Sequence, residues 1–124
     1  MDSTYTFEKR KENYVCMKIT GKYNYGKFIS YIHIAFSECE DAGFSKIMVD
    51  AREVEDANIS AMDRFGLGEE IAKVVGRRIQ IAVIWPKQYI NRFTETVAMN
   101  RGGNMRIFGT PEKGEEWLLG AGQA

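Results

Sequence analysis

The pattern of apolar and polar residues along the chain predicts five strands. Residues 4–8 alternate and are rich in β-forming side chains, and residues 14–20 repeat a strand pattern, so the two predict an antiparallel hairpin. Residues 78–85 become continuously apolar from Ile81, which is typical of a central strand covered on both faces. Two further strands are predicted at 46–50 and 104–108.

The same pattern predicts a helix over residues 27–42 and a second from Ser60 to about Val75, with an acidic loop at 51–59 before it. Gly43 follows the first helix as an expected stop. Ser60 and Asp63 have the spacing of a helix N-cap. The residues expected to face inward are Phe28, Ile32, Ala35, Phe36, Cys39, Met62, Phe65, Ile71, Ala72 and Val75.

Two shorter helices are predicted near the end of the chain. Asn91 is expected to cap the first of them, with Phe93, Val97 and Ala98 inward. Thr110 before Pro111 is a strong helix start, since a hydroxyl caps the free amides and proline suits the first turn. Trp117 and Leu118 are expected to anchor this last helix, and residues 120–124 to form a disordered tail.

The resulting order, β-β-α-β-α-β-α-β-α, predicts an α/β fold. Strands that alternate with helices favour right-handed crossovers and a mixed, mostly parallel sheet of four or five strands packed against helices. The N-terminal hairpin would supply an antiparallel edge. A chain of 124 residues has the length of one ordinary domain, so residues 1–124 are expected to form a single unit.

Composition excludes several classes of protein without naming an activity. The 17 basic and 17 acidic residues cancel, whereas a general nucleic-acid binder has a basic excess. No signal peptide or membrane span is found, and the two cysteines, Cys16 and Cys39, are interpreted as buried, reduced thiols. A cytoplasmic location is therefore expected.

The zero net charge conceals an uneven distribution. Residues 38–56 contain seven acidic and two basic side chains, and residues 73–106 contain seven basic and one acidic. Two solvated faces of opposite sign, or a self-complementary docking surface, would both explain this distribution.

Several patterns that suggest chemistry are weak. Gly66 and Gly68 resemble half of a dinucleotide-binding motif but lie inside a helical pattern, where they more simply let the helix approach the sheet. His33 is the only histidine and is interpreted as a partly exposed helix residue. The acidic residues at 38–41 diverge around a helix and do not form a metal site.

The most informative polar residues lie where predicted parallel strands end, because ligands usually bind at that edge of a sheet. Ion pairs between the acids and the arginines would explain them structurally, and an anion site or partner-docking site would explain them functionally. No nucleophile, base and orienting group occur together among them, so catalysis is not expected. The candidate site residues are Asp50, Arg52, Asp63, Arg64, Trp85 and Arg101.

The sequence resembles the SpoIIAA-like superfamily, which includes the STAS domains and the Sec14-type lipid-binding domains. It is most similar to a small bacterial branch that contains STAS/Sec14 domains. The segments that resemble it, between about residues 14 and 119, are VDAREV at 49–54, DRFGLGEEIA at 63–72, RIQIAVI at 78–84, VAMNRGG at 97–103, MRIF at 105–108 and EWL at 116–118.

The resemblance implies a mixed sheet packed against helices, no cofactor and no enzyme activity. In the anti-sigma-factor antagonist members, a serine at the start of the helix after the third strand is phosphorylated. Ser60 lies near that place, but residues 56–61 lack the surrounding motif, so a plain N-cap serine is the favoured interpretation.

Two functions remain open from the sequence. The first is a regulatory or protein-interaction domain, expected to be a homodimer, with residues 53–56 and the helix from Ser60 as its contact surface. The second is a small-molecule or lipid-binding domain, as the resemblance to Sec14-type domains suggests, although core packing is the simpler explanation of the aromatic residues concerned. Those residues are Tyr5, Phe7, Tyr14, Tyr23, Tyr25, Phe28, Tyr31 and Phe36.

Overall fold

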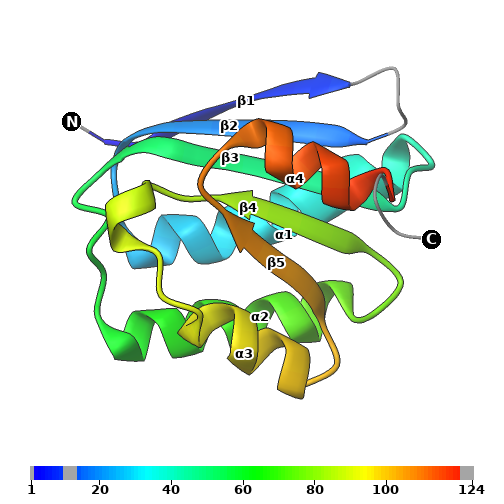
Figure 1. Ribbon diagram of the computed structural model, residues 1–124. Coiled ribbons are helices and arrows are strands. Elements are labelled where there is room, and N and C mark those ends of the chain that lie inside the picture. The colour runs from blue at the N-terminus through cyan, green and yellow to red at the C-terminus, as the bar shows by residue number, and fades with distance from the viewer. Residues whose placement is uncertain (1, 10–13, 121–124) are drawn as a thin grey trace.

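Five strands form one sheet in the order in which they occur in the chain, as the computed structural model shows (Figure 1). The structure describes residues 2–9 and 14–120. The first two strands pair antiparallel and every later pair is parallel. The strands are β1 (Thr4–Lys9), β2 (Val15–Lys22), β3 (Lys46–Glu55), β4 (Gln80–Ile84) and β5 (Asn104–Phe108).

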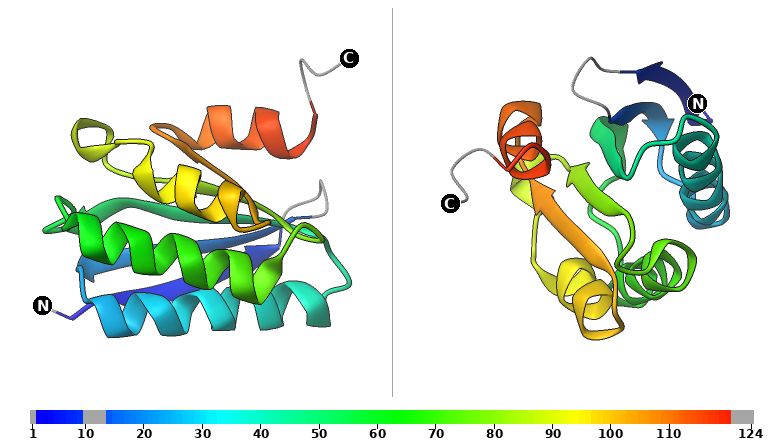
Figure 2. Two further views of the ribbon diagram at one scale, coloured as in Figure 1. Left: turned by 90° about the horizontal axis from the view of Figure 1, so that it is seen from below. Right: turned by 90° about the vertical axis from the view of Figure 1, so that its right-hand side faces the viewer.

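Three helices cover one face of this sheet and a fourth covers the other (Figure 2). Right-handed crossovers between strands that follow one another across the sheet place successive helices on the same side. The helices are α1 (Tyr25–Asp41), α2 (Ala61–Val75), α3 (Phe93–Asn100) and α4 (Pro111–Leu118), and a short 3-10 turn, η1 (Lys87–Tyr89), follows β4. The predicted α/β fold class with its mixed five-stranded sheet is confirmed.

Local sequence signals set the starts of α2 and α4 as predicted, whereas the predicted cap of α3 was wrong, because Arg92 and not Asn91 precedes its first residue. The hydroxyl of Ser60 accepts a hydrogen bond from the Asp63 amide at 3.1 Å, and Thr110 caps α4 through the Lys113 amide at 3.3 Å. α1 begins slightly earlier than predicted because Asn24 accepts from the Lys27 amide at 2.9 Å. Of the predicted tail, residues 121–124 lie outside the described residues.

The predicted acidic loop at 51–59 is wrong in its first half, because β3 continues as a strand to Glu55. Its pairing with β2 shifts register, so that Lys18 lies opposite Asp50 and Thr20 lies opposite Glu53. The extra residue in β3 forms a bulge at this point. The bulge lets a charged segment remain paired, since it changes the face to which the following side chains point.

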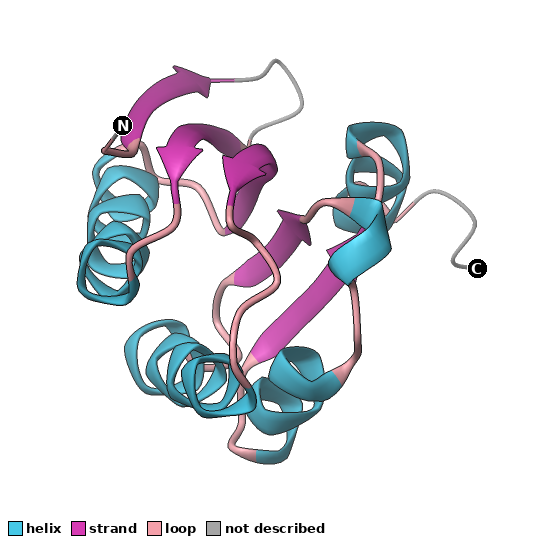
Figure 3. Cartoon of the chain, turned by 90° about the vertical axis from the view of Figure 1, so that its left-hand side faces the viewer, coloured by secondary structure: helices cyan, strands magenta, loops and turns pink. Residues whose placement is uncertain are grey.

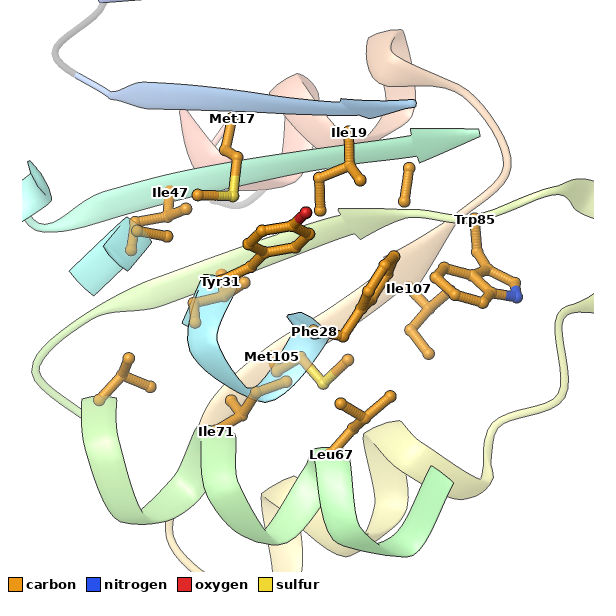
Figure 4. Close-up of a cluster of buried hydrophobic side chains, with 14 of the residues drawn as sticks. Met17, Ile19, Phe28, Tyr31, Ile47, Leu67, Ile71, Trp85, Met105 and Ile107 are labelled. Atoms are coloured by element: carbon orange, nitrogen blue, oxygen red, sulfur yellow. The ribbon is translucent and has the colours of Figure 1, made fainter. Parts of the chain in front are cut away.

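Two unequal apolar cores lie on the two faces of the sheet. The larger fills the space between the sheet and α1, α2 and α3, and its side chains converge from strands and helices in Figure 4. The smaller lies under α4. Its buried members are Tyr14, Cys16, Met48, Ala82, Ile84 and Leu118. Cys16 and Cys39 are buried and free, as predicted.

Three residues predicted to face inward are exposed instead. The Met62 side chain is 82% exposed, and Phe65 and Phe93 also lie at the surface. On α2 the inward face begins with Arg64 and continues through Leu67 and the residues that follow it at helical spacing. On α2 the prediction was wrong because the charged Arg64 takes a core-facing position, which turns its neighbours Met62 and Phe65 toward the surface.

The acidic segment 38–56 is not one surface. Glu38 and Glu40 lie at the C-terminal end of α1, whereas Glu53 and Glu55 lie at the far end of β3, across the length of the sheet (Figure 1). The basic segment 73–106 divides in the same way, because it also crosses the sheet with β4. The expectation of two opposed charged faces is therefore wrong.

Candidate functional site

The six candidate residues do not form one cluster. Figure 3 looks onto the edge of the sheet where β2 to β5 end. Asp50 and Arg52 lie on the sheet face that carries α4, since their neighbour Met48 belongs to the smaller core. Arg64 and Trp85 border the larger core, and Arg101 lies at the end of α3. The site must therefore be described as three separate places.

Asp50 and Arg52 form the predicted ion pair. The Arg52 Nε atom lies 3.3 Å from an Asp50 carboxylate oxygen, and the Arg52 amide donates to the same oxygen at 3.4 Å. Asp50 is buried and Arg52 is half exposed. The pair lies beside the bulge of β3, next to a second surface pair between Lys18 and Glu53 at 3.3 Å. This arrangement supports a structural role, because each charge already has its partner.

The other two predicted acid–arginine pairs are absent. Asp63 accepts a hydrogen bond from the Tyr23 hydroxyl at 2.9 Å, which together with burial raises the pKa of Tyr23. Arg101 pairs instead with Glu69 at 3.8 Å and lies over the ring of Phe65, 5.1 Å from its centre. Both interactions join neighbouring elements and need no ligand.

Arg64 and Trp85 connect loops that are far apart in the sequence. The Trp85 indole donates to the Ala57 carbonyl at 3.1 Å. The Arg64 guanidinium donates to the Ile59 carbonyl at 3.2 Å and to the Tyr89 carbonyl at 2.9 Å. These three bonds fasten the segment before α2 to the end of β4 and to η1. Burial lowers the pKa of Arg64.

A cavity of about 80 Å³ lies beside these two side chains, between the sheet and the helices α1, α2 and α3. Figure 4 shows Phe28, Tyr31 and Trp85 pointing into this region. Almost all of its lining is apolar. The lining residues are Met17, Ile19, Phe28, Tyr31, Ile32, Ala35, Val49, Ala51, Ile59, Arg64, Leu67, Ile71, Ile81, Val83, Trp85, Ile90, Thr94, Met105 and Ile107.

The cavity matches the sequence expectation only in part. Of the eight aromatic residues proposed from the sequence, Phe28 and Tyr31 line it. Most of its walls are aliphatic residues of the strands, which the pattern marks as core and cannot distinguish from a ligand-contacting wall. Thr94, a buried hydroxyl on α3, was not predicted, and no local signal in the sequence identifies it.

The described residues offer little for covalent or metal chemistry. Across residues 2–9 and 14–120, no three histidine, cysteine or carboxylate side chains are placed to hold a metal ion. His33 pairs with Glu70 at 2.6 Å on the surface. Burial raises the pKa of the Cys39 thiol to about 11, and that thiol donates to the Phe44 carbonyl at 3.2 Å. Cys39 is therefore a poor nucleophile at neutral pH.

Cys39 is expected to resist alkylation by iodoacetamide at pH 7.5 in the native protein. Its thiol is protonated and buried, so reaction requires opening of the structure. Mass spectrometry of the modified peptide would give an alkylation rate that rises with denaturant in step with unfolding. Rapid alkylation in native buffer would contradict this assignment.

The raised pKa of Cys39 also affects stability. Because the folded pKa lies above the unfolded one, the protonated thiol stabilises the fold below about pH 9, and this contribution is lost toward pH 11.

Comparison with known proteins identifies the architecture. The sequence matches no protein-family model and no curated protein. Among solved structures, it is similar to a protein of the DUF3478 family from Shewanella loihica PV-4, described as having a SpoIIAA-like fold. The TM-score is 0.53 and the identity 18%, over 94% of this chain and 93% of that one.

The fold is SpoIIAA-like. This confirms the resemblance drawn from the sequence, at the level of the fold. A second similar structure is the anti-sigma factor antagonist SpoIIAA in its unphosphorylated form, with a TM-score of 0.47 and 15% identity over 94% of this chain and 99% of that one. Within the described part of this SpoIIAA-like chain, no helix has the length and apolar character to cross a membrane.

Proposed function

We propose that this SpoIIAA-like chain is a non-catalytic protein-interaction domain that forms a homodimer. The observation that carries the proposal is the exposure of Met62, 82% of which is open to solvent in the first turn of α2. Phe65 follows at helical spacing and is also exposed, so the two form one apolar stripe. Covering such side chains is a common source of interface energy.

Charge supports the choice of partner. β3 ends just before α2 with the exposed carboxylates of Glu53, Glu55 and Asp56. Lys18 and Lys22 pair with the first and last of these, and Glu55 has no ion-pair partner within residues 2–9 and 14–120. The surface therefore suits a partner with an apolar side chain flanked by basic ones. A second copy offers the same apolar stripe with a basic side chain beside it, since the Arg101 guanidinium lies over the Phe65 ring. The buried free cysteines support a reducing, cytoplasmic location.

A photo-crosslinking amino acid in place of Met62 is expected to give a crosslinked dimer of the purified protein. The matched control places the same amino acid at Glu112, an exposed position of α4 on the opposite face. In parallel, Met62→Glu is expected to weaken self-association at least tenfold in sedimentation equilibrium, because it buries a charge in the contact. Equal crosslinking from both positions, or a strict monomer at the highest soluble concentration, would refute the homodimer.

The cavity supports a second candidate, the binding of a small apolar molecule. Close-packed cores rarely keep empty space larger than a water molecule, so a cavity of about 80 Å³ is unusual for purely structural packing. Native mass spectrometry of the purified protein would reveal a co-purified ligand. Ala35→Leu adds three carbons to the cavity wall and serves as the blocked control. No bound molecule on the native protein, or the same bound molecule on both proteins, would count against this candidate.

A further inference from the structure

Arg64 is an unusual residue to find in the lining of an apolar cavity. The residue is only 4% exposed, and no carboxylate of the described residues forms an ion pair with it. Its neighbour in the chain, Asp63, bonds to Tyr23 instead. Taking a charged guanidinium out of water is costly unless the charge is paired or fully hydrogen-bonded. The described part of the chain thus holds a largely buried positive charge with no carboxylate partner.

The two hydrogen bonds of Arg64 do not use its full capacity. A guanidinium carries five N–H donors. One of them serves the Ile59 carbonyl and one serves the Tyr89 carbonyl, and no further hydrogen bond joins the guanidinium to the described residues. Because no buried side-chain nitrogen of these residues lacks a partner, the remaining donors reach solvent-accessible space and are not sealed in the core. Accessible donors on a guanidinium that has no carboxylate partner suit an anionic ligand group.

The rest of the lining restricts what that ligand contains. Two other polar groups of the wall are already occupied, since the Tyr31 hydroxyl bonds to Ser3 at 2.8 Å and the Trp85 indole bonds to Ala57. Thr94 completes the polar part of the wall. Both Thr94 and Arg64 line the cavity, and Gly68, one helical turn after Arg64, packs against the Thr94 carbonyl. The polar end of the cavity is therefore small, and the remaining wall is aliphatic and aromatic.

We propose that the cavity binds a short apolar carboxylic acid, with its carboxylate on Arg64 and its hydrocarbon part against the aliphatic wall. The proposal rests on the second candidate function above and names its ligand class. Planar, bidentate pairing with a carboxylate is the geometry for which arginine is best suited. A volume of about 80 Å³ equals the share of roughly two to three liquid water molecules, so a hydrocarbon chain of about three carbons beyond the carboxylate fills the space.

Isothermal titration calorimetry with butanoate and with 1-butanol tests the proposal directly. The two probes have the same number of carbons, and only butanoate carries a charge. Butanoate is expected to bind the native protein at least tenfold more tightly than 1-butanol, and Arg64→Met is expected to abolish that preference. Arg52→Gln removes an arginine on the other face of the sheet and should preserve the preference. Ala35→Leu should bind neither probe.

A second measurement keeps the test valid if Arg64→Met does not fold. In the native protein, the NMR signal of the Arg64 Nε–H group is expected to shift on titration with butanoate and to remain unchanged with 1-butanol. Equal affinity for both probes, or an Arg64 signal that butanoate does not move, would overturn the carboxylate assignment while leaving an apolar ligand possible. If neither probe binds, both this proposal and the second candidate fail, and the interaction surface at Met62 is unaffected.

Discussion

Replacing Trp85 with alanine is expected to lower the free energy of unfolding by about 3–5 kcal/mol, the usual cost of removing a large buried aromatic side chain. Trp85 packs edge-on against Phe28 at 6.2 Å, borders the cavity and bonds to the Ala57 carbonyl. Its loss enlarges a space that is already incompletely filled, so little of the cost is recovered by relaxation. Urea unfolding followed by circular dichroism would measure the change.

The conservative variant Trp85→Phe retains part of the packing. It keeps one aromatic ring and loses the second ring and the indole donor, so a smaller cost than that of Trp85→Ala is expected. If the free energy of unfolding of Trp85→Ala lies within about 1 kcal/mol of that of the native protein, Trp85 does not stabilise the fold by packing. Its position at the strand end must then be explained by function alone.

Replacing Gly68 with alanine is expected to destabilise the fold by about 3 kcal/mol, at the upper end of overpacking costs. A Cβ atom there would lie 2.7 Å from the Thr94 carbonyl oxygen and 3.0 Å from Val97. A backbone oxygen does not rotate aside as a side chain does, so α2 and α3 would have to separate. Thermal unfolding by calorimetry would record a lower midpoint temperature.

Gly26→Ala is the matched control, because Gly26 also lies in a helix. A Cβ at that position would meet only the Asn24 side chain, at an ordinary 3.5 Å. Alanine is expected to stabilise α1 there by up to about 1 kcal/mol, since it has less backbone freedom to lose on folding. The two substitutions should therefore act in opposite directions. Equal effects would show that the contact between α2 and α3 is looser than described.

The fold was predictable where the signal is local. A capping hydroxyl at Ser60 or Thr110 contacts an amide three residues on, so sequence spacing alone specifies the bond. The small residue Gly68 was also recognised as a contact point, although its partner is α3 and not the sheet. The continuation of β3 was not predictable, because acidic residues disfavour strands intrinsically, and only the bulge opposite β2 accommodates them here.

The candidate site was predictable only for groups close in the chain. Asp50 and Arg52 are two residues apart and form the pair that the sequence favoured. Arg64 bonds to a carbonyl 25 residues away, so its role depends on how η1 packs against α2. Helical periodicity assigned Met62 to the core and gave no warning that Arg64 would replace it there. A pattern based on polarity assigns every charged residue to the surface, so it cannot predict a charged residue in the core.

Only one helix, α4, covers the second face of the sheet, so the two cores need different free energies to open. α4 has eight residues, and it alone closes the smaller core, which its Leu118 joins. Detachment of α4 would expose only the few side chains beneath it, whereas opening of the larger core separates three helices from the sheet. The C-terminal helix is therefore a sub-global folding unit with its own, lower opening free energy. The surface under it becomes accessible far more often than the cavity on the opposite face.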